Sequence, residues 1–145
     1  MDSRAILAEL PRLRRYARAM LGDRAAADDL VQDTLERAWS RIAQWRPGSD
    51  LRAWLFGIMH NLRIDQLRRN GLPTTSLDED EVAEVPVRPT QSDLLEVMDL
   101  ESALRQLPDD QREVLLLVAL EEMSYVDIAA LLGIPVGTVM SRLSR

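Results

Sequence analysis

The sequence predicts an all-α protein with two small helical domains joined by an acidic, flexible linker. Apolar residues recur at helical spacing on both sides of a central segment that is rich in proline and acid and has no such period. The C-terminal end also shows a helix-turn-helix pattern. We expect the first domain at residues 1–71, the linker at 72–91 and the second domain at 92–145.

Composition argues against several classes of function. Of the 145 residues 46% are hydrophobic, which is enough for a core, and none is cysteine. Disulfides, zinc-thiolate sites and thiol catalysis are therefore excluded, and the single histidine, His60, excludes a polyhistidine metal site. The sequence contains no Gly-rich phosphate loop and no catalytic triad. We expect no enzyme activity, no cofactor, no metal and no small-molecule substrate.

The charge is unevenly distributed. Residues 1–71 hold 13 Arg against 9 acids, residues 72–110 hold 2 against 11, and residues 111–145 hold 3 against 4. The first segment is therefore basic although the whole chain has a net charge of -6. Every basic residue is arginine, which suits phosphates and base edges but could equally reflect genome composition.

The localisation is predicted from what the sequence does not contain. No run approaches the length of a membrane span, and the N-terminus lacks the apolar core of a signal peptide. We expect a soluble, cytoplasmic protein.

The first domain begins with two predicted helices. Residues 4–21 form an arginine-rich helix that Pro11 divides, and we interpret its arginines as a solvated face. Residues 25–44 form a longer helix, whose apolar stripe places Trp39 in the core. Its opposite face is acidic, and is either simply solvated or a docking face for a basic partner. That face comprises Asp28, Asp29, Gln32, Asp33, Glu36 and Arg37.

A loop at residues 45–50, with Pro47-Gly48 as its turn signal, leads to a third helix at 51–69. The helix has basic residues off its apolar stripe, and Asn70-Gly71 ends it. A basic helix beside an aromatic-bearing loop could hold single-stranded nucleic acid by stacking and charge. The alternative places Trp39, Trp45 and Trp54 in the core.

The linker contains three prolines and the acidic run at residues 78–81, and such a segment is ordinarily a solubilising tether. After it, Ser92 caps a predicted helix that reaches Leu107, and Pro108 opens the next one. That next helix supplies Val114, Leu117, Val118 and Leu120 to the core.

Residues 124–145 read as two short helices around a tight turn. Ser124 and Asp127 have capping-box spacing, Gly133 suits a helix C-terminus, and Pro135 opens the second helix. Val139 and Leu143 lie on one face of that helix and leave Thr138, Ser141, Arg142 and Arg145 on the other. Spacing alone leaves open a DNA-binding helix-turn-helix and a helical hairpin that never touches DNA.

Three stretches together resemble the bacterial sigma factors of the extracytoplasmic-function (ECF) group of the sigma-70 family. DDLVQDTLERAW at 28–39 resembles the core-binding helix of sigma region 2, and LRAWLFGIMHNLRIDQLRR at 51–69 resembles its promoter-melting helix. The stretch at 107–145 resembles the helix-turn-helix domain of sigma region 4. Both halves in this order, with a short linker, make the resemblance specific.

The resemblance implies a role for each half. Four residues should bind the clamp helices of the largest subunit of core RNA polymerase: Asp29, Leu30, Gln32 and Asp33. Loop 45–50 and the next helix should bind the minus-10 element as a melted strand, through Trp54, Asn61, Arg63 and Arg68. The last helix should read the minus-35 element of promoter DNA through Thr138, Ser141, Arg142, Ser144 and Arg145, with Arg142 going either to phosphate or to a nearby acid. The linker should run along the RNA path of the polymerase.

The implied function is transcription initiation by a stress- or signal-responsive sigma factor, controlled by an anti-sigma factor that is often membrane-anchored. Two departures matter: Met140 stands where the family often has a base, and the family's last helix usually continues past the position of Arg145. Either the chain is trimmed there or the protein is naturally short and binds the minus-35 element weakly.

Three rival classes remain. They are, in descending order, a helix-turn-helix regulator that binds duplex DNA without polymerase, an adaptor that makes only protein contacts, and an enzyme.

Overall fold

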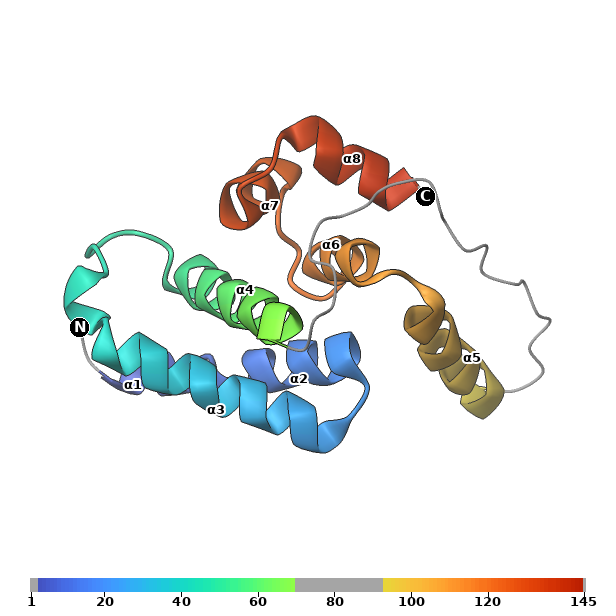
Figure 1. Ribbon diagram of the computed structural model, residues 1–145, viewed down its shortest axis with the longest axis horizontal. Helices are drawn as coiled ribbons and strands as arrows, with labels where there is room; N and C mark the ends of the chain where they lie inside the picture. Colours follow the sequence, from blue (N-terminus) through green and yellow to red (C-terminus); the bar gives the residue numbers. More distant parts are fainter. Residues whose placement is uncertain (1–2, 70–92, 145) are drawn as a thin grey trace.

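The computed structural model describes residues 3–69 and 93–144, and these residues form α-helices and connecting turns without a strand (Figure 1). The all-α prediction is confirmed. The N-terminal half contains α1 (Ser3–Ala8), α2 (Leu10–Leu21), α3 (Arg24–Ser40), the 3-10 turn η1 (Ile42–Gln44) and α4 (Leu51–Arg69). The C-terminal half contains α5 (Asp93–Gln106), α6 (Asp109–Ala119), α7 (Tyr125–Leu132) and α8 (Val136–Ser144). The predicted linker, the end at Asn70-Gly71 and the cap at Ser92 lie outside the described residues.

Local signals set several of the helix ends. The Ser124 side chain accepts a hydrogen bond from the backbone N–H of Asp127 at 3.1 Å, and Gly133 ends α7 with φ +72°. Both features were predicted. The first helix is divided as expected, but the break lies at Glu9, and Pro11 sits in the first turn of α2, where its missing N–H costs nothing.

The predicted helix at 25–44 ends early, and one core assignment in it is wrong. α3 stops at Ser40, and Trp39 is 39% exposed. Neighbouring residues on a helix are about 100° apart, so only one of Ala38 and Trp39 can face inward. Ala38 is fully buried, and the indole of Trp39 is therefore turned toward the surface.

The N-terminal half packs α2, α3 and α4 against one another. The Tyr16 and Phe56 rings meet edge to face, with centroids 5.0 Å apart and an interplanar angle of 82°. Thr34 is fully buried on α3, and its hydroxyl donates to the carbonyl of Leu30 at 2.7 Å. This bond satisfies the only polar side chain that α3 buries.

The two halves are packed against each other. α6 lies against α2 on one side and α8 on the other, and α7 lies against α4 (Figure 1). Buried apolar side chains from Ile6 to Val139 form one continuous cluster. Leu117 of α6 and Leu131 of α7 thus border the same small space as Tyr16 and Met59.

Arg112 of α6 connects the two halves by hydrogen bonds inside this junction. Its Nε donates to the carbonyl of Leu104 and its Nη2 to the carbonyl of Leu107, both at 2.7 Å. Its Nη1 donates to the carbonyl of Met20 at 3.0 Å and to Asp109 Oδ1 at 3.2 Å. Burial lowers the pKa of Arg112, and the nearby carboxylate of Asp109 opposes that shift. These four acceptors replace the water molecules that the guanidinium loses on burial.

Further polar contacts surround Arg112. Arg12 pairs with the buried carboxylate of Glu121 at 3.4 Å, and the Arg15 side chain donates to the carbonyl of Leu120 at 3.2 Å. On α4, His60 Nδ1 and Glu113 Oε2 lie 2.5 Å apart. These contacts join residues more than 50 positions apart in the sequence.

No single helix in the described ranges is long and apolar enough to cross a bilayer. Only α7 and α8 taken as a pair, bent by 107° at their turn, reach that length and composition.

We expect Arg112→Ala to lower the free energy of unfolding by about 3 kcal/mol, because it leaves buried carbonyls and a carboxylate without their donor. Urea denaturation followed by circular dichroism measures the change. Arg14→Ala is the control, since Arg14 is exposed and makes no polar contact among the described residues. A loss no larger than that of the control would contradict the role given to Arg112.

Stability should also fall in alkaline solution. Burial raises the pKa of Tyr16 well above its ordinary 10.0, and the carboxylates of Glu113 and Asp109 add to the rise. A raised folded pKa means that the stability is fully present below the unfolded pKa and is lost as pH rises through the folded one.

The chain has no lysine or cysteine, so tyrosines dominate this titration. Urea unfolding at about pH 8 and about pH 11 should show a loss for the native protein that Tyr16→Phe reduces. An equal loss in Tyr16→Phe would show that groups other than Tyr16 cause the effect.

Candidate functional site

The outer face of α3 is acidic, and the described part of the chain leaves it exposed. Asp29, Gln32 and Asp33 are exposed, and neither carboxylate has an ion-pair partner in the part of the chain that the structure describes. Asp28 differs, because it pairs with Arg18 at 3.4 Å. Leu30 is 1% exposed and belongs to the core. The apolar stripe of the sequence predicts this burial, and the side chain of Leu30 supports the acidic face from beneath.

The residues expected to contact the minus-10 element divide between two sides of α4. Trp54, Asn61 and Arg68 are spaced seven apart, which places them on one side of the helix. Asn61 and Arg68 are exposed, whereas Trp54 is half-buried against the core. Arg63 lies two residues after Asn61, and therefore on the opposite side.

Arg63 faces the C-terminal half. Its Nη2 lies 3.4 Å from Asp109 Oδ1 of α6, and 23% of its side chain is exposed. Its Nε is buried and has no hydrogen-bond partner in the described part of the chain. On its other side Arg63 lines a pocket of about 390 Å³ together with Asp29, Gln66 and Arg69. Arg63, which the resemblance assigns to DNA, is thus paired with Asp109, a residue that the sequence did not assign to any site.

The loop between η1 and α4 presents one tryptophan. Trp45 is half-buried, and its indole Nε1 is buried without an acceptor among residues 3–69 and 93–144. Asp50 ends the loop by accepting a hydrogen bond from the backbone N–H of Ala53 at 3.2 Å, which caps α4. The loop therefore stays attached to the helix that carries Asn61.

The second helix of the helix-turn-helix, α8, has a weakly polar outer face. Gly137, Met140, Ser141 and Ser144 are exposed and follow helical spacing, so they form one stripe. No charged side chain lies on this stripe between Val136 and Ser144. Thr138 is half-buried, and Arg145 lies outside the described residues.

In this structure Arg142 pairs with an acid, which is one of the two alternatives left open for it. The Nε of Arg142 lies 3.6 Å from Asp110 Oδ2 of α6, and 17% of its side chain is exposed. Arg142 therefore lies on the side of α8 that faces α6 rather than on its outer stripe.

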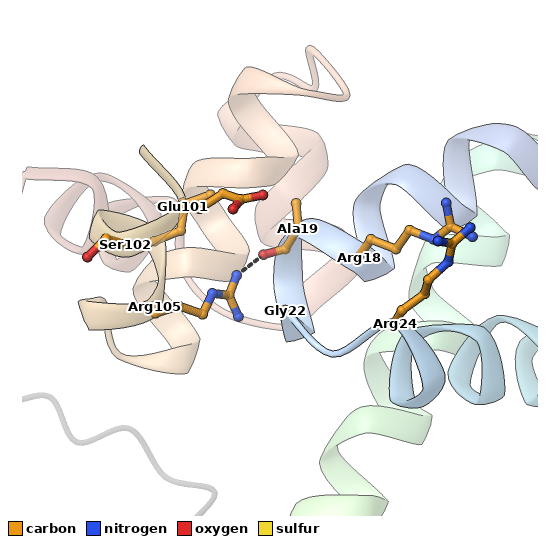
Figure 2. A pocket seen from close by; sticks show the side chains of 8 residues that line it. Arg18, Ala19, Gly22, Arg24, Glu101, Ser102 and Arg105 are labelled. Carbon is orange, nitrogen blue, oxygen red and sulfur yellow. Dashed lines mark hydrogen bonds between the residues drawn. The ribbon is translucent and has the colours of Figure 1, made fainter. Parts of the chain in front are cut away.

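A pocket of about 650 Å³ opens where α5 meets the end of α2 (Figure 2). Arg105 of α5 donates to the carbonyls of Ala19 and Met20 and so caps the C-terminus of α2. Gly22 beside it has φ +79°, and a Cβ there would lie 2.6 Å from the guanidinium of Arg105. Arg105 thus holds α5 against the end of α2 at the junction between the two halves.

Comparisons with known proteins agree with this arrangement. A family model described as the Sigma2 domain of PhyR matches residues 6–60, and one described as Sigma-70, region 4, matches residues 98–145. The ECF RNA polymerase sigma factor EcfG of Rhodopseudomonas palustris is 42% identical over 140 residues, which cover 97% of this chain and 77% of that protein.

Two solved structures have the same fold. The sigma factor RpoE from Bartonella quintana, in complex with the anti-sigma factor NepR, superimposes with a TM-score of 0.75 at 36% identity, covering 99% of this chain and 89% of that one. CnrH, in complex with the cytosolic domain of CnrY, gives 0.69 at 29% identity, covering 99% and 80%. The chain belongs to the ECF group of the sigma-70 family.

Proposed function

We propose that this chain binds core RNA polymerase and directs it to specific promoters in the cytoplasm. The observation that carries the proposal is the 42% identity to an ECF sigma factor across 97% of the chain. In this proposal residues 1–71 bind polymerase and the minus-10 element, residues 72–91 link the halves, and residues 92–145 read the minus-35 element.

The described surfaces of α3, α4 and α8 support a different binding role for each helix. Asp29 and Asp33 are exposed and have no ion-pair partner among the described residues, which suits a basic partner, and we assign the acidic face of α3 to the polymerase clamp. The side of α4 that carries Asn61 and Arg68, beside the loop with Trp45, suits a melted strand that needs both stacking and charge. The outer stripe of α8 has the dimensions of a helix that enters a major groove.

An anti-sigma factor is the proposed regulator. The similar RpoE is bound by the anti-sigma factor NepR, which supports an equivalent partner for this chain. A membrane-anchored form of that partner is the family's frequent arrangement.

Initiation with purified components tests the function. The chain is mixed with core polymerase and a library of promoter fragments, and initiated transcripts are sequenced. A sigma factor yields initiation at a defined set of promoters. A regulator of the helix-turn-helix class would bind duplex DNA and yield no initiation with core enzyme, which would overturn the proposal.

We expect Asp29→Arg combined with Asp33→Arg to abolish co-purification with core polymerase, because the reversal places two cations opposite a basic surface. Circular dichroism should be unchanged, since both side chains are exposed. The matched control is Asp29→Glu with Asp33→Glu, which keeps the charge. Undiminished binding by the reversed variant would rule out this face as the dock.

Asn61→Ala and Arg63→Ala should both reduce opening of the minus-10 element, but in different ways. An exposed amide can read a base edge, so Asn61→Ala should change the preference among minus-10 variants. Arg63 suits a phosphate, and its loss should weaken all variants alike.

Permanganate footprinting of the polymerase complex on a set of minus-10 variants measures both effects, with Arg14→Ala as the control for loss of one arginine. Equal weakening of every variant by Asn61→Ala would show that Asn61 reads no base.

A further inference from the structure

We propose that Asp109 and Asp110, the acidic pair, act as an internal competitor of promoter DNA by holding one arginine from each half of the chain. Asp109 holds Arg63 of α4, and Asp110 holds Arg142 of α8. The inference rests on the proposed function, because it assumes that both arginines are DNA contacts.

The geometry comes from one turn of one helix. Consecutive residues project about 100° apart, so two adjacent carboxylates at the start of α6 can reach opposite neighbours. α6 packs against α8 (Figure 1), and its first turn reaches α4 through the side chain of Asp109. The ion pairs measure 3.4 Å for Arg63–Asp109 and 3.6 Å for Arg142–Asp110. One short acidic segment thereby occupies both arginines at once.

The carboxylates do not depend on these arginines. Both lie in the first turn of α6, where the positive end of the helix dipole stabilises negative charge. Asp109 also keeps a second cation, since Arg112 lies 3.2 Å away. When Arg63 or Arg142 leaves, its carboxylate remains stabilised, and release of the arginine carries little penalty.

The arginines can exchange one oxyanion for another. A guanidinium matches carboxylate and phosphate geometry equally well. All four side chains are partly exposed, with the acids at 35% and 26%, and such pairs are weak enough for DNA to displace. Because Arg142 is the one charged side chain of α8 between Val136 and Ser144, pairing it removes the charge of that helix segment.

The test is a set of double-mutant cycles on the full chain, with binding measured by fluorescence anisotropy. The probes are a mixed-sequence DNA duplex for Arg142 and a mixed-sequence single strand for Arg63, both at low salt. Asp110→Asn should tighten duplex binding roughly two- to fivefold, the range that a partly exposed ion pair supports. The gain should vanish in the Arg142→Ala background.

Asp109→Asn should tighten single-strand binding by a similar factor, and that gain should vanish with Arg63→Ala. The asparagine keeps an oxygen that can accept from Arg112, and circular dichroism checks the fold. If Asp109→Asn unfolds, the Asp110 cycle decides, because Asp110 contacts only Arg142 among the described ion pairs.

Asp127→Asn controls for general relief of charge, since Asp127 is an exposed acid in the first turn of α7 without an ion pair in the described ranges. Its small effect should be the same with and without Arg142. Absence of any gain from Asp110→Asn, or a gain that persists without Arg142, would overturn the inference. These cycles need no polymerase, so a failure of promoter-specific initiation would count against the proposed function alone.

Discussion

The junction between the two halves depends on a buried guanidinium. An arginine can leave water only where acceptors replace its hydration, and Arg112 finds them on both sides of the junction. Two of its acceptors are carbonyls at the end of α5 and in the following turn, and a third is the carbonyl of Met20 in the last turn of α2. The side chain thus fixes the angle between α5 and α6 and at the same time binds α6 to the N-terminal half. The contacts at Arg12, Arg15 and His60 can form because Arg112 has brought the helices into register.

Local signals explain what the sequence predicted well. The helix at 51–69 was predicted at its observed bounds, and the caps at Ser124 and Gly133 form as expected, because periodicity and capping depend on neighbouring residues alone. Trp39 was wrongly predicted to be buried. Adjacent residues at the edge of an apolar stripe both fit the helical period, and only packing decides which of them faces the core. Leu30 is buried as its place in the apolar stripe predicts, and the resemblance alone gives it a role in polymerase binding.

The contacts between the halves could not be predicted in this way. Arg12 and Glu121 are 109 residues apart, and Arg63 and Asp109 are 46 apart. An acid in the first turn of a helix is sufficiently explained by the helix dipole, so Asp109 and Asp110 carried no sequence signal of a second role. Arg63 was correctly placed off the apolar stripe of α4, but its orientation depends on which helix packs beside it. Only the three-dimensional arrangement shows that this neighbour is α6.

The close approach of Gly22 and Arg105 constrains how this chain can vary. A methyl group at position 22 would meet the guanidinium that caps α2, and the positive φ at that position is one that side chains rarely adopt. A larger residue at 22 therefore displaces the Arg105 side chain, which leaves the last carbonyls of α2 to find another donor. Two positions 83 residues apart, in different halves of the chain, are thereby coupled, and a substitution at 22 should favour one at 105 among sequences that keep the halves in contact. Such paired substitution is a trace of the junction that could be recognised in sequences alone.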